Sequence, residues 1–414
     1  MRKLTGLICF LLTALTAMSA VPLAGVWNGK LDLGAAQLTL VLRISDEEPP
    51  VVILDSPDQG AEGIPTDVKY LSADSIAIQI PQLGVTYNAA LQQASLIGTF
   101  TQMGYKLPLT LNRGEQLRLR PQTPQPPFDY DTQEVSFPSI DQDVTLNGTL
   151  TLPQGVTKDT PVVVMVTGSG LQNRDEELFG HKPFAVIADY LANTGIASLR
   201  YDDRGYGGSD EAAENATTLD FANDAEGAIR FLRGMGYTKV GVLGHSEGGT
   251  IAFITAAESE PVLRPDFLVT IGAPTLDGKD ILLDQLRTVK PDVTDTEEHV
   301  LIERAETVGS PWMQYFVKFD PAAVITKAIN LPVLAIYGSK DTQVRPAINE
   351  PVMHRLLESN PNCQIVVLDG LNHLLQPADT GSIDEYSSIS TTIAPVALEL
   401  IAAFVRNLYS LSKK

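Results

Sequence analysis

The alternation of short apolar runs with amphipathic segments over residues 161–414 constrains the fold of this chain more than any other feature. Runs typical of buried parallel strands lie at residues 162–166, 197–201, 240–243, 267–271, 333–337 and 365–368. Helical patterns lie at residues 183–193, 221–235, 249–257, 348–358 and 393–408. The pattern predicts an α/β fold with a doubly wound, mostly parallel sheet and helices on both faces. Residues 134–137 and 144–152 are expected to open this sheet as an antiparallel pair.

One interval interrupts the rhythm of strand and helix. Residues 275–330 carry three helical patterns in succession, at residues 280–287, 297–308 and 311–319. In a sheet of this kind, ligands bind outside the carboxyl ends of the strands. We therefore expect residues 275–330 to form a helical cap insertion over such a site.

A G-x-S-x-G pattern joins one predicted strand to the helix that follows it, at residues 244–248. Between a strand and a helix, this pattern is typical of a nucleophile elbow, in which Ser246 stands at the tip of a sharp turn. Flanking glycines let strand and helix approach each other closely. The three positions coincide by chance in about one chain in seven of this length. A glycine-rich turn with an incidental serine is therefore the alternative.

A base and an acid are expected at the ends of later strands, because acyl transfer by serine needs both. Asp341 follows the strand at 333–337, and His373 follows the strand at 365–368. The chain order Ser246, Asp341, His373 is the order that such a sheet uses. The side chains that compete for these two roles are His181, His245, His299, His354, Asp320 and Asp369.

The oxyanion hole is expected to combine two backbone N–H groups. One is that of Glu247, and the other comes from the loop at residues 167–170, with Ser169 as the first candidate and Gly170 as the second. The polar residues 173–175 are expected to brace this loop, with a role in lining the pocket as the alternative. Arg204 is expected to be structural.

The first part of the chain has a different character. Short segments of alternating polarity at residues 26–33, 37–44, 51–54, 75–80, 85–91 and 96–101 read as strands. They predict a small all-β domain, a barrel or a sandwich, over residues 21–113. Trp27 is expected to fill its core, with sugar stacking as the alternative. A proline-rich linker is expected at residues 114–130, followed by the catalytic domain at residues 131–414.

The first twenty residues have the layout of a cleavable signal peptide. Arg2 and Lys3 precede an apolar stretch at residues 4–17, and small residues follow at Ser19 and Ala20. We expect export to the periplasm or the extracellular space, with an uncleaved anchor as the alternative. Once Cys9 is removed, Cys363 has no partner for an intramolecular disulfide.

Net charge and motif content exclude several classes of function. The formal net charge of −20 argues against nucleic acid and anionic membranes as partners. Neither an H-E-x-x-H motif nor paired cysteines occur, and the glycines at 168–170 lack the lysine of a phosphate-binding loop. We therefore expect no metal, no nucleotide and no other cofactor.

Six short motifs stand out along the second part of the chain: GSG at 168–170, RD at 174–175, YDDRG at 201–205, GHSEGG at 244–249, SPW at 310–312 and LNH at 371–373. With these motifs, residues 134–410 resemble the α/β-hydrolase superfamily, and in particular the EstD-type bacterial serine esterases. The resemblance implies a serine carboxylesterase that acts on short-chain acyl esters. It maps the triad onto Ser246, Asp341 and His373.

The sequence thus predicts a small-molecule acyl ester as substrate. Trp312, Tyr315 and Phe316 in the insertion are expected to wall the acyl pocket, or else to pack the insertion onto the sheet. One alternative is a serine peptidase of the aminopeptidase kind, in which the Glu247 carboxylate would bind a free amino terminus. Another is a binding protein on a hydrolase scaffold, with the all-β domain as the functional part.

Overall fold

The computed structural model describes residues 23–33, 37–59, 61–114, 120–141, 144–211, 214–257, 260–328 and 330–410. The expected signal peptide and Cys9 lie outside these residues. The chain divides into two units, Met1–Leu117 and Arg118–Lys414. Each unit has a hydrophobic core of its own, one in the first and two in the second.

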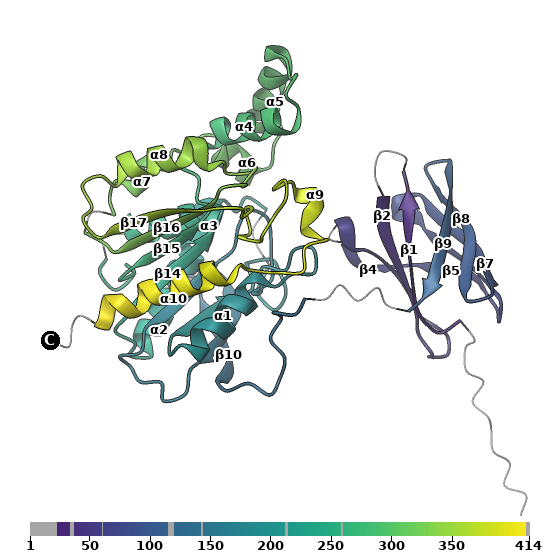
Figure 1. The fold of residues 1–414 in the computed structure, drawn as a ribbon, viewed down its shortest axis with the longest axis horizontal. Helices are drawn as coiled ribbons and strands as arrows, with labels where there is room; N and C mark the ends of the chain where they lie inside the picture. The colour runs from purple at the N-terminus through teal and green to yellow at the C-terminus, as the bar shows by residue number, and fades with distance from the viewer. Residues whose placement is uncertain are drawn as a thin grey trace, which may run out of the picture. The chain divides into compact units, whose positions relative to one another are not determined.

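The first unit is mostly β, as expected, and its strands form a nine-stranded antiparallel sheet (Figure 1). Six strands correspond to the predicted segments, and Ala61–Pro65, Asp67–Leu71 and Tyr105–Arg113 are additional. The strands are β1 (Gly25–Asp32), β2 (Gln37–Ile44), β3 (Val52–Ser56), β4 (Ala61–Pro65), β5 (Asp67–Leu71), β6 (Ser75–Ile80), β7 (Val85–Gln92), β8 (Ser95–Gln102) and β9 (Tyr105–Arg113).

The order of the strands shows that this sheet curls back on itself. It reads β4-β3-β2-β1-β9-β8-β7-β6-β5, so β4 and β5 lie at opposite edges. Yet only Thr66 separates these two strands in the chain. One residue spans only about 3.5 Å, so the two edges must meet at Thr66. The geometry is therefore that of a barrel, with the single segment 61–71 crossing its seam.

Trp27 fills the core of this barrel. Its side chain is fully buried, and its indole N–H donates to the Leu23 carbonyl at 2.9 Å. The Arg113 guanidinium lies 4.6 Å from the ring centroid. Because no face of the ring is exposed, Trp27 serves as a core residue and offers no platform for stacking sugars.

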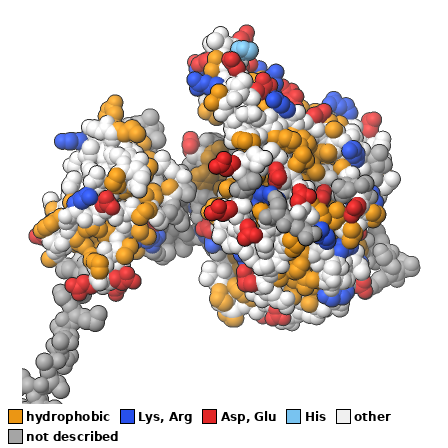
Figure 2. Space-filling model, turned by 180° about the vertical axis from the view of Figure 1, so that it is seen from behind, with side chains coloured by type: hydrophobic (Ala, Val, Ile, Leu, Met, Phe, Trp, Pro, Cys, Tyr) orange, Lys and Arg blue, Asp and Glu red, His pale blue; other side chains and the backbone are white. Residues whose placement is uncertain are grey.

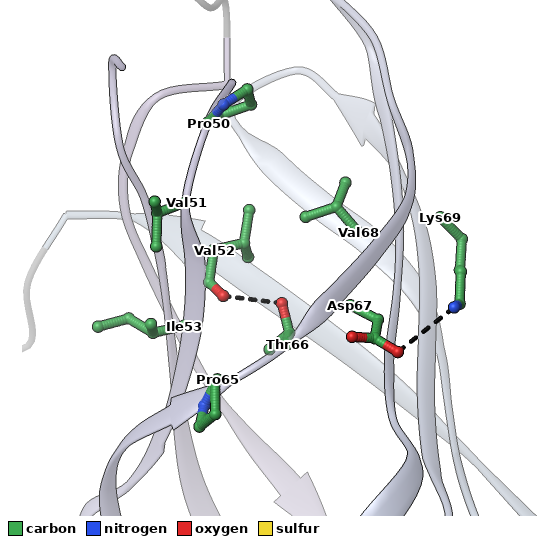
Figure 3. Close-up of a pocket in the computed structure, with 9 residues that line it drawn as sticks. All are labelled: Pro50, Val51, Val52, Ile53, Pro65, Thr66, Asp67, Val68 and Lys69. Atoms are coloured by element: carbon green, nitrogen blue, oxygen red, sulfur yellow. Dashed lines mark hydrogen bonds and ion pairs between the residues drawn. The ribbon is translucent and has the colours of Figure 1, made fainter. Parts of the chain in front are cut away.

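A shallow depression of about 610 Å³ lies at the barrel seam (Figure 3). Its walls are the segments 50–53 and 65–69, joined by a hydrogen bond of 2.8 Å from the Thr66 hydroxyl to the Val52 carbonyl. The lining residues include no histidine, serine or cysteine. The depression therefore lacks the paired serine or cysteine and histidine that the predicted type of site requires.

The second unit is built on an eight-stranded sheet in the order β10-β11-β13-β12-β14-β15-β16-β17. The first two strands are antiparallel to their neighbours, and all pairs from β13 to β17 are parallel. The strands are β10 (Asp131–Pro138), β11 (Thr145–Leu152), β12 (Val162–Val166), β13 (Ala197–Tyr201), β14 (Val240–His245), β15 (Leu268–Ile271), β16 (Val333–Gly338) and β17 (Cys363–Leu368).

Helices cover both faces of this sheet. On one face, α1 (Pro183–Asn193) and α10 (Pro395–Ser410) enclose one core (Figure 1). On the other face, α2 (Thr218–Gly234), α3 (Glu247–Ala257) and α8 (Pro346–Leu356) enclose a second core. Strands between two such layers are buried on both sides, which explains the unbroken apolar runs in the sequence.

A helical insertion separates β15 from β16, and part of it projects from the body of the second unit (Figure 1). It contains α4 (Gly278–Val289), α5 (Asp295–Thr307), α6 (Pro311–Phe316) and the short α7 (Ala322–Ile325), which the sequence had not indicated. Side chains cap α4, α5 and α6 at Asp277, Thr294 and Ser310. These caps define where each helix begins.

The second half of the expected linker is anchored to the second unit. Arg120 donates to the carbonyls of Phe179, Ser387 and Ile389 at 2.7–2.9 Å. Gln122 donates to the Ile393 carbonyl at 2.8 Å. These bonds hold the segment just before α10. Proline content alone had predicted an extended connector over the whole of residues 114–130.

The surface of the chain mixes all types of side chain. On the face shown in Figure 2, acidic residues are scattered among basic and hydrophobic ones. Among the described residues, no helix has both the length and the apolar character needed to cross a membrane.

Candidate active site

Ser246 lies at the junction of β14 and α3, in a strained backbone conformation. Its φ is +53°, in the left-handed region that residues other than glycine rarely adopt. The strand ends at His245 and the helix begins at Glu247, so the reversal takes place at this one residue. Strain of this kind is characteristic of functional positions.

The glycines on either side of Ser246 are required for steric reasons. A Cβ atom on Gly244 would overlap the backbone carbonyl of Gly248, and a Cβ atom on Gly248 would overlap the carbonyl of Val166. Both obstacles are main-chain atoms, which cannot move aside as a flexible side chain can. The local sequence therefore permits the sharp turn that the G-x-S-x-G pattern predicts.

His373 and Asp341 form a buried hydrogen-bonded pair. The Nδ1 atom of His373 lies 2.6 Å from Oδ2 of Asp341, and both side chains are at least 96% buried. The other carboxylate oxygen of Asp341 accepts the N–H groups of Gln343 and Val344, each at 2.8 Å. Asp341 follows β16 and His373 follows β17, which are neighbouring parallel strands. The fold thus brings the two residues to the same edge of the sheet.

The backbone contacts of Ser246 connect it to the surroundings of His373. Its N–H donates to the Ile271 carbonyl at 2.8 Å, and the next residue, Gly272, lies directly against the His373 ring. A Cβ atom on Gly272 would be 2.8 Å from His373 Nδ1, so only glycine leaves room for the imidazole. The ring centroid of His245 lies 4.6 Å from that of His373. Ser246 therefore stands beside the histidine and aspartate pair.

A second buried pair, Glu176 and His245, supports the loop that faces Ser246. His245 Nδ1 lies 2.7 Å from Glu176 Oε1, and the same oxygen accepts the N–H of Gly168 at 3.0 Å. His245 Nε2 donates to the His373 carbonyl at 3.1 Å. Burial lowers the pKa of His245, but the Glu176 carboxylate outweighs this effect and the net pKa is raised. The raised pKa favours protonation of both ring nitrogens, and a ring in that state donates to both acceptors.

The loop at residues 167–170 is held from beneath by Asp203. The Thr167 hydroxyl and the Gln172 N–H both donate to its carboxyl group, at 2.9 Å. Burial raises the pKa of Asp203 to about 8 despite these hydrogen bonds. A Cβ atom on Gly168 would lie 3.3 Å from the Cβ atom of Ser246, so the loop faces the serine.

The side chains of residues 173–175 bond to neighbouring strands and loops of the second unit. Arg174 binds both carboxylate oxygens of Asp202, at 3.1 and 2.8 Å. Arg204 is structural as well: it is 1% exposed and binds both carboxylate oxygens of Asp224, at 2.8 and 2.7 Å. Both side chains are thus engaged within the protein.

Glu247 begins α3, so its N–H is one of those that have no acceptor within the helix. Its carboxyl group is buried, which raises its pKa. The Thr218 hydroxyl and the Trp312 indole N–H donate to it at 2.7 and 2.9 Å, and the Ser169 hydroxyl also hydrogen-bonds to it.

The three aromatic residues predicted to wall an acyl pocket have different surroundings. Trp312 stacks on Phe316, with ring centroids 5.3 Å apart, and donates to Glu247. Phe316 lines a small cavity that Glu247 also lines. Tyr315 stacks on Phe319, at 5.6 Å. Trp312 and Phe316 therefore border the site, whereas the observed ring contact of Tyr315 is with another residue of the insertion.

The competing histidines and aspartates have other partners. His181 is fully buried between the Thr392 hydroxyl and the Tyr386 carbonyl, at 2.9 and 3.1 Å. His299 lies in α5, and His354 lies in α8. Asp320 accepts the N–H of Ala322 at the start of α7, and Asp369 accepts the Ser339 hydroxyl.

Sequence reasoning missed the Glu176 and His245 pair and the side-chain contacts of Glu247. The sequence indicated His245 only as a competitor of His373 for the role of base. Glu176 lies 69 residues before it, and no spacing rule connects the two. In the described part of the chain, no cluster of three or more His, Cys, Asp or Glu side chains has the geometry to hold a metal ion.

The second unit is similar in sequence to several known proteins. Residues 161–296 match the family model described as the alpha/beta hydrolase fold. Esterase EstD from Thermotoga maritima is 30% identical over 254 residues, which cover 57% of this chain and 60% of EstD. The chain thus spans less than two thirds of that relative's length. An acyl transferase from Shewanella hanedai is 25% identical over 242 residues, covering 56% of this chain and 74% of that protein.

Among solved structures, the esterase Pf2001 from Pyrococcus furiosus is similar with a TM-score of 0.46 and 17% identity, covering 67% of this chain and 90% of that chain. The sheet order, the elbow and the sequence matches agree with one another. The second unit is therefore similar to the alpha/beta hydrolase fold family over residues 161–296 and to the EstD-type esterases.

Proposed function

We propose that the chain is a serine carboxylesterase that hydrolyses short-chain acyl esters. The observation that carries the proposal is the position of Ser246, at φ +53° beside the buried pair of His373 and Asp341. A half-buried serine on such a turn, next to a histidine that a carboxylate orients, can be activated as a nucleophile. The similarity to EstD supports an ester as the substrate.

In the proposed reaction, His373 Nε2 takes the proton of the Ser246 hydroxyl as Oγ attacks the ester carbonyl. Asp341 holds the other ring nitrogen and stabilises the imidazolium that forms. The tetrahedral intermediate collapses when His373 returns the proton to the departing alcohol, and an acyl-enzyme remains. His373 then deprotonates a water molecule, which attacks the acyl-enzyme and releases the acid and free Ser246.

The oxyanion is proposed to be held by the N–H groups of Glu247 and Ser169, with Gly170 as the second candidate in the loop. The N–H of Gly168 donates to Glu176, so the donors that follow it in the loop are better placed for this role. Each such donor contributes about 10²–10³ to kcat in serine hydrolases.

The helical insertion is proposed to act as a cap over this site. The bond from Trp312 to Glu247 joins it to the first residue of α3. Trp312 and Phe316 are the residues we propose for the acyl side of the pocket.

The proposal is tested with p-nitrophenyl acetate, butyrate and octanoate as substrates. The wild-type chain is compared with Ser246→Ala and with Ser95→Ala as the control, since Ser95 lies in the first unit. We expect the short esters to be preferred and Ser246→Ala to lose several orders of magnitude in kcat. Activity that survives in Ser246→Ala would exclude the proposed nucleophile.

Two further results would redirect the proposal. Hydrolysis of aminoacyl anilides in preference to esters would establish a peptidase. An inactive wild-type chain whose first unit binds a ligand would favour a binding protein on a hydrolase scaffold.

A further inference from the structure

One carboxyl group connects three separate parts of the second unit. The Glu247 side chain receives the Thr218 hydroxyl from α2, the Trp312 indole N–H from the insertion and the Ser169 hydroxyl from the loop that faces Ser246. We call this set of four residues the Glu247 bridge. Glu247 and Ser169 are also the residues whose backbone N–H groups form the proposed oxyanion hole.

The Glu247 bridge is enclosed by protein. The side chain of Glu247 lies between two small cavities, one beneath the loop and one beneath the insertion. The donors to its carboxyl group are all uncharged, and Tyr201 and Asp203 are the other titratable side chains that line the cavity beneath the loop. A hydrogen-bonded carboxyl group in such surroundings holds its partners more firmly than it would in water.

We propose that Glu247 is a positioning residue whose carboxyl group ties Trp312 of the insertion to Ser169 of the oxyanion loop. The placement of the second oxyanion donor then depends on where the insertion lies. This inference rests on the proposed function, since it assigns a purpose to contacts around the proposed oxyanion hole. The inference also explains why a glutamate follows Ser246 in the G-x-S-x-G pattern.

The bridge also bears on the peptidase alternative. A carboxylate that bound a substrate's amino terminus would have to leave its acceptor positions free for that amine. Glu247 instead accepts two donors on Oε1 and a third from Ser169. Its hydrogen-bonding capacity is directed at the protein itself.

Loss of the bridge should affect the transition state more than the ground state. Ser169 lies between Gly168 and Gly170, which leave its backbone free to shift when the bond from its hydroxyl to Glu247 is lost. A displaced oxyanion donor weakens the binding of the tetrahedral intermediate but leaves ester binding nearly unchanged. The expected signature is a lower kcat at constant KM.

The test uses the full chain and the variants Glu247→Leu, Trp312→Phe and the corresponding double variant. Leucine offers no acceptor, whereas the amide oxygen of a glutamine would keep both bonds at Oε1. Glu247→Gln serves only the second readout below, because its side chain does not titrate. Trp312→Phe removes the indole N–H, and the smaller phenyl ring can still stack on Phe316. We expect each single change to lower kcat for p-nitrophenyl acetate by about tenfold. The double variant should also lose about tenfold, and not a hundredfold, because both changes break the same link. Glu298→Gln is the matched control, since Glu298 pairs with Arg287 within the insertion.

The second readout is the emission of Trp312, obtained as the difference between the spectra of the wild-type chain and of Trp312→Phe. It does not depend on catalysis. The emission should titrate in the wild type at a pH above 4.5, the ordinary pKa of glutamate, because burial raises the pKa of Glu247. The same difference taken in the Glu247→Gln background should lack this titration.

The outcomes are distinguishable. Unchanged kcat and KM in folded Glu247→Leu would overturn the bridge while leaving the esterase intact. Multiplicative effects of the two changes would do the same, because independent residues combine in that way. If Ser246→Ala retains activity, the proposed function fails instead. A Trp312 emission that ignores Glu247→Gln would refute the contact itself.

Discussion

Asp341→Asn tests the orientation of His373 with almost no change of shape. Oδ1 of Asp341 accepts the N–H groups of Gln343 and Val344, whereas Oδ2 faces His373 Nδ1 at 2.6 Å. In the variant, the amide oxygen must stay with the two N–H groups, so the NH₂ group must face Nδ1. The ring then accepts at Nδ1 and carries its proton on Nε2, where it cannot take the proton of Ser246.

The expected effect is large because the pair is buried and no water can replace the carboxylate. In a serine protease whose geometry is otherwise kept, the same change lowers kcat by about 10⁴, which corresponds to about 5.4 kcal/mol. We expect a loss of this order for p-nitrophenyl acetate, with KM within about threefold of the wild type. The two N–H bonds at Oδ1 survive, so the thermal midpoint should move little.

Steady-state hydrolysis and thermal unfolding are measured on the same samples. Asp369→Asn is the matched control, because Asp369 is an exposed carboxylate that follows the adjacent strand β17. It should retain wild-type kcat. If Asp341→Asn keeps kcat within tenfold of the wild type while Asp369→Asn does not, the assignment of the acid is wrong.

Three further perturbations test the elbow, the oxyanion loop and the first unit. Gly244→Ala adds a methyl group that overlaps a backbone carbonyl and should lower the free energy of unfolding by about 1–3 kcal/mol. Gly234→Ala, where space is open, should leave stability unchanged. Equal thermal midpoints of the two variants would contradict the elbow. Asp203 has a pKa of about 8 when folded and an ordinary value of 3.8, so its stabilising protonation is fully present below about pH 4 and is lost as the pH rises to about 8. In urea unfolding at about pH 5 and pH 8.5, the stability of the wild type relative to Asp203→Asn should therefore fall with rising pH, and a constant difference would count against the raised pKa. Trp27→Ala should destabilise the first unit by about 3–5 kcal/mol, seen in calorimetry as an earlier transition; an unmoved transition would show that the buried ring contributes little.

Much of the fold follows from patterns within short windows of sequence. The six apolar strands of the second unit were predicted because burial on both faces produces unbroken apolar runs, such as Val162–Val166. In the first unit, β5 was missed because four of its five residues are exposed, so no alternation marks it. Its counterpart β4 contains Pro65, which disfavours a strand in any local scheme. Both strands are edge strands of the curled sheet, paired with β3 and β6, and they depend on those partners more than on their own sequence.

The candidate site also contains residues that the sequence predicted and contacts that it did not. Ser246, Asp341 and His373 could be found from the sequence because each follows a strand in a fixed order, and parallel strands bring their carboxyl ends to one edge. The Glu176 and His245 pair could not be found, since its members lie 69 residues apart and pair only through the packing of the loop. For Glu247, the sequence indicated a backbone donor but gave no sign of the bridge to Trp312.

The sequence by itself therefore determined the class of fold, the elbow and the order of the three candidate residues, because hydrophobic period and glycine placement act over a few residues. Only the tertiary structure decided which buried charges pair and how the insertion meets the site. Those contacts join segments that lie tens of residues apart, and the orientation of each side chain depends on everything packed around it. The sequence supplied the chemical groups, and the packing of the second unit gave Glu247 and His245 their partners.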